Sequence, residues 1–234
     1  MNWWRNFKLK TRNFYKKIFE PIGVFLGKLG FTPNMVSLSS GLFAIATAIM
    51  YSLQGRITSF DFWWLIGFAL MIFTSFLDMV DGSIARATKN TSNFGKVLDP
   101  VMDRFAELCF VIGIAIGNYT FEPIASLWAP IATIPIGAWC LFCFAGMIFA
   151  SYVRGKAESV NHMTVESVGI MERREKLALL YLGNLLYFWY PVALIFAIIL
   201  IGFLSFITTF QRMFYIRKIM VENEEPTNKQ STNQ

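Results

Sequence analysis

DMVDGSIARATKNTSNFGKVLDPVMD, residues 78–103, is the stretch around which the rest of the chain is arranged. Apolar runs flank it on both sides, at 62–77 and at 105–116. It contains four aspartates, which are Asp78, Asp81, Asp99 and Asp103. The first two are three residues apart and the last two are four apart, and in a helix each spacing keeps a pair on one face. The sequence therefore predicts two apolar helices whose ends bring four carboxylates to one spot, near the mouth of a membrane-buried bundle.

Four carboxylates crowded beside an apolar bundle repel one another, so they are stabilised when cations lie between them. Hard oxygen ligands of this kind suit Mg²⁺ or Mn²⁺ and not zinc. Gly82, Ala85 and Gly95 leave room beside the carboxylates for a ligand to lie against the backbone, and Arg86 adds a cation to the same surface. This combination indicates a metal-dependent phosphoryl-type transfer. Helix caps or a solvated surface would explain any one of the aspartates, but not four at these spacings.

Composition indicates a membrane protein. The chain has 234 residues, of which 55% are hydrophobic and only 15% are charged, whereas soluble domains carry about 25% charged residues. The formal net charge of +6 could suggest nucleic acid as a partner. Because the positive charges adjoin apolar runs, we expect anionic lipid headgroups as partners instead, and no nucleic acid.

The predicted fold class is an all-α integral membrane protein with six transmembrane helices, preceded by an N-terminal amphipathic helix in the membrane interface over residues 1–30. Pro21 is expected to break that first helix. Since each span needs about 20 apolar residues, the predicted spans are Pro33–Leu53, Phe60–Arg86, Gly95–Asn118, Ile124–Arg154, Leu177–Tyr190 and Pro191–Arg212. One domain should cover residues 1–220, and the polar segment 221–234 should be a disordered tail.

Positive charge predicts the orientation of the chain. With six spans both termini lie on one side, and all of the 21 Lys and Arg residues except Arg56 fall on that side. Lysine and arginine are enriched in cytoplasmic loops. We therefore expect a multi-pass protein of the cell membrane, with both termini and the aspartates on the cytoplasmic side.

A second group of cations lies at three predicted helix ends on that side. Its members are Arg154, Lys156, Arg173 and Arg212. Charges that merely follow the positive-inside rule would give the same pattern. That interpretation is favoured from the charges alone, but guanidinium groups also bind phosphate in bidentate geometry, so a pocket of these cations would suit a phosphate on an acceptor alcohol.

The pattern D-x2-D-G-x2-A-R-x8-G-x3-D-x3-D is matched at every fixed position, from Asp78 to Asp103. It resembles the signature of the CDP-alcohol phosphotransferase family, and the resemblance extends from about Pro21 to Arg217. It implies a homodimer of six-helix subunits and a Mg²⁺-dependent site where an alcohol displaces CMP from a CDP-linked lipid. The donor would be CDP-diacylglycerol or CDP-archaeol.

The resemblance also implies roles for the residues of the motif. Asp78, Asp81, Asp99 and Asp103 would be the metal ligands, and Asp103 would in addition accept the proton of the attacking hydroxyl. The residues expected to cradle the nucleotide are Gly82, Ala85, Arg86 and Gly95.

Two further segments, SYVRGKAE at 151–158 and MERREK at 171–176, look like those of the family branch that uses inositol phosphate, the phosphatidylinositol phosphate and archaetidylinositol phosphate synthases. The resemblance implies that Arg154, Lys156, Arg173 and Arg212 hold the inositol phosphate. Arg174 stands where that branch commonly has proline, and Lys176 where it commonly has arginine.

Other functions stay open at this point. Glycerol 3-phosphate is an alternative acceptor, and the chain would then be a phosphatidylglycerophosphate synthase. From another class, a cation-coupled transporter would also place acids in a membrane. The predicted position of the aspartates near one membrane face, and not at the midplane, favours the enzyme.

Overall fold

The computed structural model describes residues 19–57, 62–88, 93–119, 134–161 and 168–231, and within these ranges the chain forms helices and no strand. It divides into two compact units, Met1–Asn118 and Tyr119–Gln234, which are considered separately. The prediction of an all-α fold is confirmed for the described residues.

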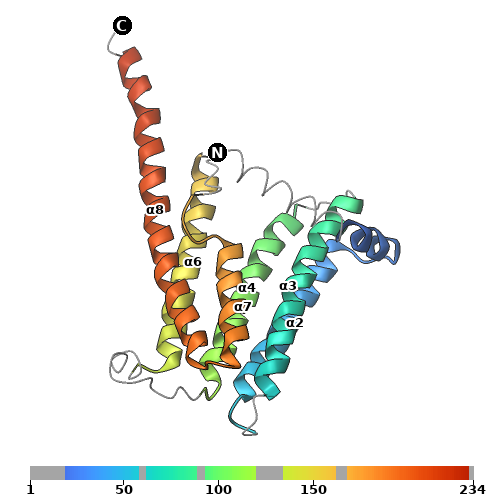
Figure 1. The fold of residues 1–234 in the computed structure, drawn as a ribbon. Helices are drawn as coiled ribbons and strands as arrows, with labels where there is room; N and C mark the ends of the chain where they lie inside the picture. Colours follow the sequence, from blue (N-terminus) through green and yellow to red (C-terminus); the bar gives the residue numbers. More distant parts are fainter. Residues whose placement is uncertain (1–18, 58–61, 89–92, 120–133, 162–167, 232–234) are drawn as a thin grey trace, which may run out of the picture. The chain divides into compact units, whose positions relative to one another are not determined.

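The first unit holds a helical segment over residues 19–28, followed by α2 (Pro33–Leu53), α3 (Phe62–Thr88) and α4 (Gly95–Ile116). Helix α2 packs along both α3 and α4 (Figure 1). It begins where the sequence predicts, because the Thr32 side chain accepts a hydrogen bond of 3.3 Å from the Met35 N–H and Pro33 occupies the first helical position.

Small residues allow α2 to approach both of its neighbours closely. A Cβ atom added at Gly67 of α3 would lie 2.8 Å from the Tyr51 ring, and one added at Gly113 of α4 would lie 2.7 Å from the Ala48 Cα atom. Glycine at such crossings lets helix backbones come into contact. Helix α2 is therefore the element against which both aspartate-bearing helices are placed.

The helical segment 19–28 packs against α3. Phe19 forms a buried cluster with Val36, Val80 and Ile84. A Cβ atom at Gly23 would lie 2.7 Å from the Ser83 carbonyl carbon, so the two backbones are in contact there. The described helix spans residues 19–28 and has Pro21 in its first described turn, so the expected break at Pro21 stays a prediction. Residues 1–18, the rest of the expected interfacial helix, lie outside the described residues.

The second unit consists of α6 (Ile136–Asn161), α7 (Arg173–Tyr187) and α8 (Val192–Ser231). Helix α8 packs against α6 and α7 (Figure 1). A Cβ atom at Gly202 of α8 would lie 2.7 Å from the Phe142 ring of α6, so these helices also meet at a glycine.

Several helix boundaries differ from the prediction. Helix α6 begins at Ile136, later than expected, and the expected start at Ile124 lies outside the described residues. Pro135 directly precedes it, and a proline is disfavoured anywhere after the first turn of a helix. Helix α7 begins four residues earlier than predicted, and α8 continues to Ser231, into the segment expected to be a disordered tail. The division into a domain over 1–220 and a tail over 221–234 stays a prediction.

Four of the described helices are long and apolar enough to cross a membrane, judged by length and composition. They are Pro33–Leu53, Phe62–Thr88, Ile136–Val160 and Val192–Val221. Helix α4 is long enough, but charged residues occupy its first half. Helix α7 has 15 residues, fewer than the roughly 20 that a span needs.

Candidate active site

Three of the four predicted aspartates come together in the first unit. Asp78 of α3 and both Asp99 and Asp103 of α4 each offer a carboxylate oxygen, and these oxygens all lie within 4.8 Å of one another. Asp78 and Asp103 are half-buried, and Asp99 is exposed. The spacing of four residues in α4 puts its two carboxylates on one face, as predicted.

Asp81 occupies a different environment. Its side chain is 6% exposed, and its Oδ2 atom accepts a hydrogen bond of 2.7 Å from the hydroxyl of Ser37 on α2. Ser37 is itself 5% exposed. No local pattern singles out Ser37, because only the packing of α2 on α3 brings it to Asp81. Metal binding by Asp81 stays a prediction.

The surface beside the carboxylates has the open backbone that the sequence predicts. A Cβ atom added at Gly82 would lie 3.3 Å from the Arg86 guanidinium, which is the one group of the described residues found within 4 Å of it outside the local helix backbone. Arg86 is exposed and donates a hydrogen bond of 3.0 Å to the Ser83 hydroxyl. Ala85 lies one turn along α3, and Gly95 is the first residue of α4. Among the residues that the structure describes in this unit, the flexible Arg86 side chain is the one that a ligand would displace to reach the Gly82 backbone.

The donor set of this cluster fits a divalent cation. Three carboxylate oxygens from two helices converge, and hard oxygen donors suit Mg²⁺ or Mn²⁺. Carboxylates held this close also repel one another, so a cation between them is stabilising.

The predicted acceptor cations all belong to the second unit. Arg154 and Lys156 lie near the end of α6, Arg173 is the first residue of α7, and Arg212 lies in α8. Arg154 is exposed to solvent by 43% and forms an ion pair of 2.9 Å with Glu158. Lys156 is exposed and Arg173 is half-buried. Helices α6 and α7 both pack on α8. The four cations therefore lie in three helices of one packed unit.

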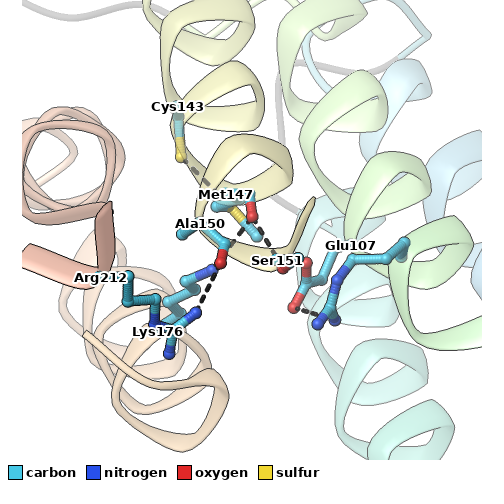
Figure 2. A network of polar contacts seen from close by, with 8 residues as sticks. Glu107, Cys143, Met147, Ala150, Ser151, Lys176 and Arg212 are labelled. Atoms are coloured by element: carbon cyan, nitrogen blue, oxygen red, sulfur yellow. Dashed lines mark hydrogen bonds and ion pairs between the residues drawn. The ribbon is translucent and has the colours of Figure 1, made fainter. Parts of the chain in front are cut away.

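Arg212 is buried, with 5% of its surface exposed. Its Nε atom donates to the Val168 carbonyl over 2.9 Å and its Nη1 atom to the Ala150 carbonyl of α6 over 2.6 Å. Figure 2 shows the side chain reaching from α8 to α6. These two bonds join three segments of the second unit through one guanidinium group, in addition to any role toward a ligand.

Lys176 is a buried cation to which the sequence assigned no function. It is 4% exposed, and its ammonium group donates to the Met147 carbonyl of α6 over 3.4 Å (Figure 2). Glu107 in the first unit is also buried, at 2% exposed, and pairs with Arg104 over 3.3 Å. For Glu107 the sequence signal was a charged residue inside an apolar helix, and for Lys176 it was the charged segment 171–176 before an apolar run.

The fold and the aspartate cluster agree with the family to which the chain belongs. Residues 31–221 match the model of the CDP-alcohol phosphatidyltransferase family, so the chain is a member of that family. Family membership and the apolar helices together make it an integral membrane protein and a transferase.

Two curated relatives are named as synthases of inositol phosphate lipids. The archaetidylinositol phosphate synthase of Pyrococcus horikoshii is 30% identical over 209 residues, which cover 89% of this chain and 96% of the relative. The phosphatidylinositol phosphate synthase of Streptomyces avermitilis is 28% identical over 233 residues, which cover 96% of this chain and 88% of the relative.

Solved structures of the Mycobacterium tuberculosis phosphatidylinositol phosphate synthase share the fold. The one with CDP-DAG bound has a TM-score of 0.69 at 24% identity and covers 86% of this chain and 94% of its own. The one in complex with manganese and citrate has a TM-score of 0.68 at 24% identity and covers 85% of this chain and 88% of its own.

Proposed function

We propose that this protein transfers a phosphatidyl or archaetidyl group from CDP-diacylglycerol or CDP-archaeol to inositol phosphate and releases CMP. The observation that carries the proposal is the convergence of the Asp78, Asp99 and Asp103 carboxylates within 4.8 Å, in a chain of the CDP-alcohol phosphatidyltransferase family. Relatives named as synthases of inositol phosphate lipids support the choice of acceptor. Family membership favours an enzyme over a cation-coupled transporter.

The proposed arrangement in the membrane has six transmembrane helices and an N-terminal interfacial helix. Four helices have the length and composition of spans, and α4 and α7 would complete the six. Charge placement supports cytoplasmic termini and a cytoplasmic site, because all Lys and Arg residues except Arg56 would lie on one side. By analogy with the family, the protein is a homodimer.

The proposed reaction forms one phosphorus–oxygen bond and breaks another. Asp103 takes the proton of the acceptor hydroxyl, whose oxygen bonds to the lipid-bearing phosphorus while the bond to CMP breaks. Asp78, Asp81, Asp99 and Asp103 would hold Mg²⁺ or Mn²⁺, which when bound stabilises the negative charge that develops on the departing CMP. Gly82, Ala85, Arg86 and Gly95 bind and orient the nucleotide against α3 and α4.

The acceptor phosphate would be held by Arg154, Lys156, Arg173 and Arg212. Four cations suit a dianion, because each charge-assisted hydrogen bond to phosphate is roughly twice as strong as a neutral one. A neutral polyol offers no comparable partner. Support for this assignment comes from the membership of all four residues in helices of the second unit.

The proposal is tested by CMP release from the purified protein in detergent. The CDP-lipid is held constant while inositol phosphate, glycerol 3-phosphate, free inositol and serine are compared as acceptors, with Mg²⁺ and with the metal chelated. We expect Mg²⁺-dependent release of CMP with inositol phosphate and little with free inositol. A preference for glycerol 3-phosphate would move the protein to the alternative branch. No CMP release with any acceptor would contradict the reaction itself.

A further inference from the structure

The segment that leads into α7, residues 168–171, is hydrogen-bonded to side chains from about one turn of α8. The Met171 N–H donates to the Thr208 hydroxyl over 3.0 Å, and the Ile170 N–H donates to the Gln211 side-chain oxygen over 3.1 Å. Arg212 completes the set through its bond to the Val168 carbonyl. Successive main-chain groups of residues 168–171, here called the connector, therefore bond to side chains of α8.

The contact at Thr208 is buried and closely fitted. Thr208 is 0% exposed and Met171 is 2% exposed. Gly169 has φ +112°, a conformation that favours glycine, and a Cβ atom there would collide with the Thr208 side chain. The connector thus has a backbone shape that fits against one particular side chain of α8.

The connector ends where a predicted acceptor cation begins. Glu172 is the N-cap of α7 and Arg173 is its first residue, so Arg173 lies two residues beyond the Met171 amide that Thr208 holds. A change in the path of the connector would move the Arg173 backbone directly. Thr208 itself has its hydroxyl bonded to the main chain and is fully buried.

We propose that Thr208 is a positioning residue for acceptor recognition, which fixes the entry of α7 and with it the placement of Arg173 toward the acceptor's phosphate. The inference rests on the proposed function, since it gives Arg173 the task of binding that phosphate. Lys176, one turn along α7, reinforces the same placement through its bond to the Met147 carbonyl of α6 (Figure 2).

The test compares two neighbouring threonines. Thr208→Val removes the hydroxyl that accepts the Met171 N–H but keeps the volume that fits against Gly169. Thr209→Val is the matched control, because Thr209 is also buried, at 6% exposed, and among the described residues its hydroxyl bonds to the Ser205 carbonyl within α8. Thr208→Ser restores the hydroxyl alone.

We expect Thr208→Val to raise the KM for inositol phosphate by roughly two- to tenfold, the effect of one hydrogen bond. The KM for the CDP-lipid should not change, because α3 and α4 hold that substrate. The Met171 amide should exchange with deuterium faster, Thr208→Ser should recover most of the wild-type KM, and Thr209→Val should match the wild type.

Lower thermal stability of Thr208→Val with an unchanged KM for inositol phosphate would overturn the inference and leave Thr208 a purely structural residue. If Thr208→Val does not fold, Gln211→Leu replaces it, because it removes the acceptor of the Ile170 N–H in the same connector and predicts the same rise in KM. Failure of the proposed function is seen separately, in the wild type, as equal reaction with free inositol and with inositol phosphate.

Discussion

Ser37 of α2 donates a hydrogen bond of 2.7 Å to the buried Oδ2 atom of Asp81 on α3. The bond ties the central helix of the first unit to the aspartate motif, at a point where both side chains are almost fully buried. Ser37 also lies within hydrogen-bonding distance of the Pro33 carbonyl in its own helix, at 3.1 Å. A bond to a buried carboxylate is the more consequential of the two, because water cannot replace it.

Ser37→Ala should lower the free energy of unfolding by about 1–3 kcal/mol, since it leaves a buried carboxylate oxygen without its donor. Ser39→Ala is the control, because Ser39 is half-buried and, among the described residues, its hydroxyl bonds to the Met35 carbonyl one turn earlier in the same helix. Thermal or denaturant unfolding in detergent measures the difference. Equal stability of the two variants would show that the Ser37 bond to Asp81 does not stabilise the fold.

Close packing of the segment 19–28 on α3 gives a second prediction. Gly23→Ala should destabilise the protein by roughly 1–3 kcal/mol, because its Cβ would lie 2.7 Å from backbone that cannot move independently. Gly27→Ala would contact the methyl group of the Thr88 side chain, at 2.8 Å, and not backbone, so a side-chain adjustment relieves the contact at a smaller cost. Both variants gain similar helix propensity. Unfolding experiments that found Gly23→Ala as stable as Gly27→Ala would contradict the close contact.

Sequence patterns predicted the helices of the motif and the meeting of three of its four carboxylates, while the structure bonds Asp81 to Ser37 instead. The bounds of α2 were predicted correctly, because Thr32 and Pro33 are local signals that a helix begins. Asp99 and Asp103 follow helix geometry, so their alignment needs no tertiary information. The length of α8 and the start of α7 were not predicted, since no cap or apolar period marks them.

Residues whose role depends on tertiary packing could not be predicted from the sequence. Ser37, Thr208 and Lys176 each bond to a partner at least 29 residues away in the chain. No local sequence pattern distinguishes Thr208 from Thr209. The difference is that the folded connector bonds to the Thr208 hydroxyl, whereas the Thr209 hydroxyl bonds within α8. The burial of Arg212 was likewise invisible, because its position near the end of the predicted span suggested an exposed cation.

Arg154 and Arg212 should respond differently to neutralisation. Arg154→Gln should raise the KM for inositol phosphate by about 10- to 150-fold, through loss of a charge-assisted contact. Its stability should hardly change, because an exposed ion pair contributes about 0–1 kcal/mol. Arg212→Gln should raise the same KM and also lower the melting temperature, since the Val168 and Ala150 carbonyls lose their donor.

Kinetics with varied acceptor and varied CDP-lipid, together with thermal unfolding, separate these effects. An unchanged acceptor KM in Arg154→Gln would remove Arg154 from the proposed phosphate site. A change confined to the KM for the CDP-lipid would show that the cations serve the donor instead.

Asp103→Asn tests the assignment of the base. If Asp103 takes the proton of the hydroxyl, turnover should fall by about 10²–10⁴-fold while CDP-lipid still binds. Equilibrium binding of the CDP-lipid and of Mn²⁺ provides the comparison. Loss of metal binding in this variant would make Asp103 a metal ligand first and a base second.

The most direct test of the account is CMP release by Asp78→Asn and Asp99→Asn, measured across a titration of Mg²⁺. These residues come from different helices, and the carboxylate oxygens of their cluster lie within 4.8 Å of one another. We expect both variants to stay folded, because removing one of several crowded charges relieves repulsion. We also expect both to lose turnover even at saturating Mg²⁺. Near-normal CMP release by either variant at saturating Mg²⁺ would contradict the assignment of this cluster as the metal site.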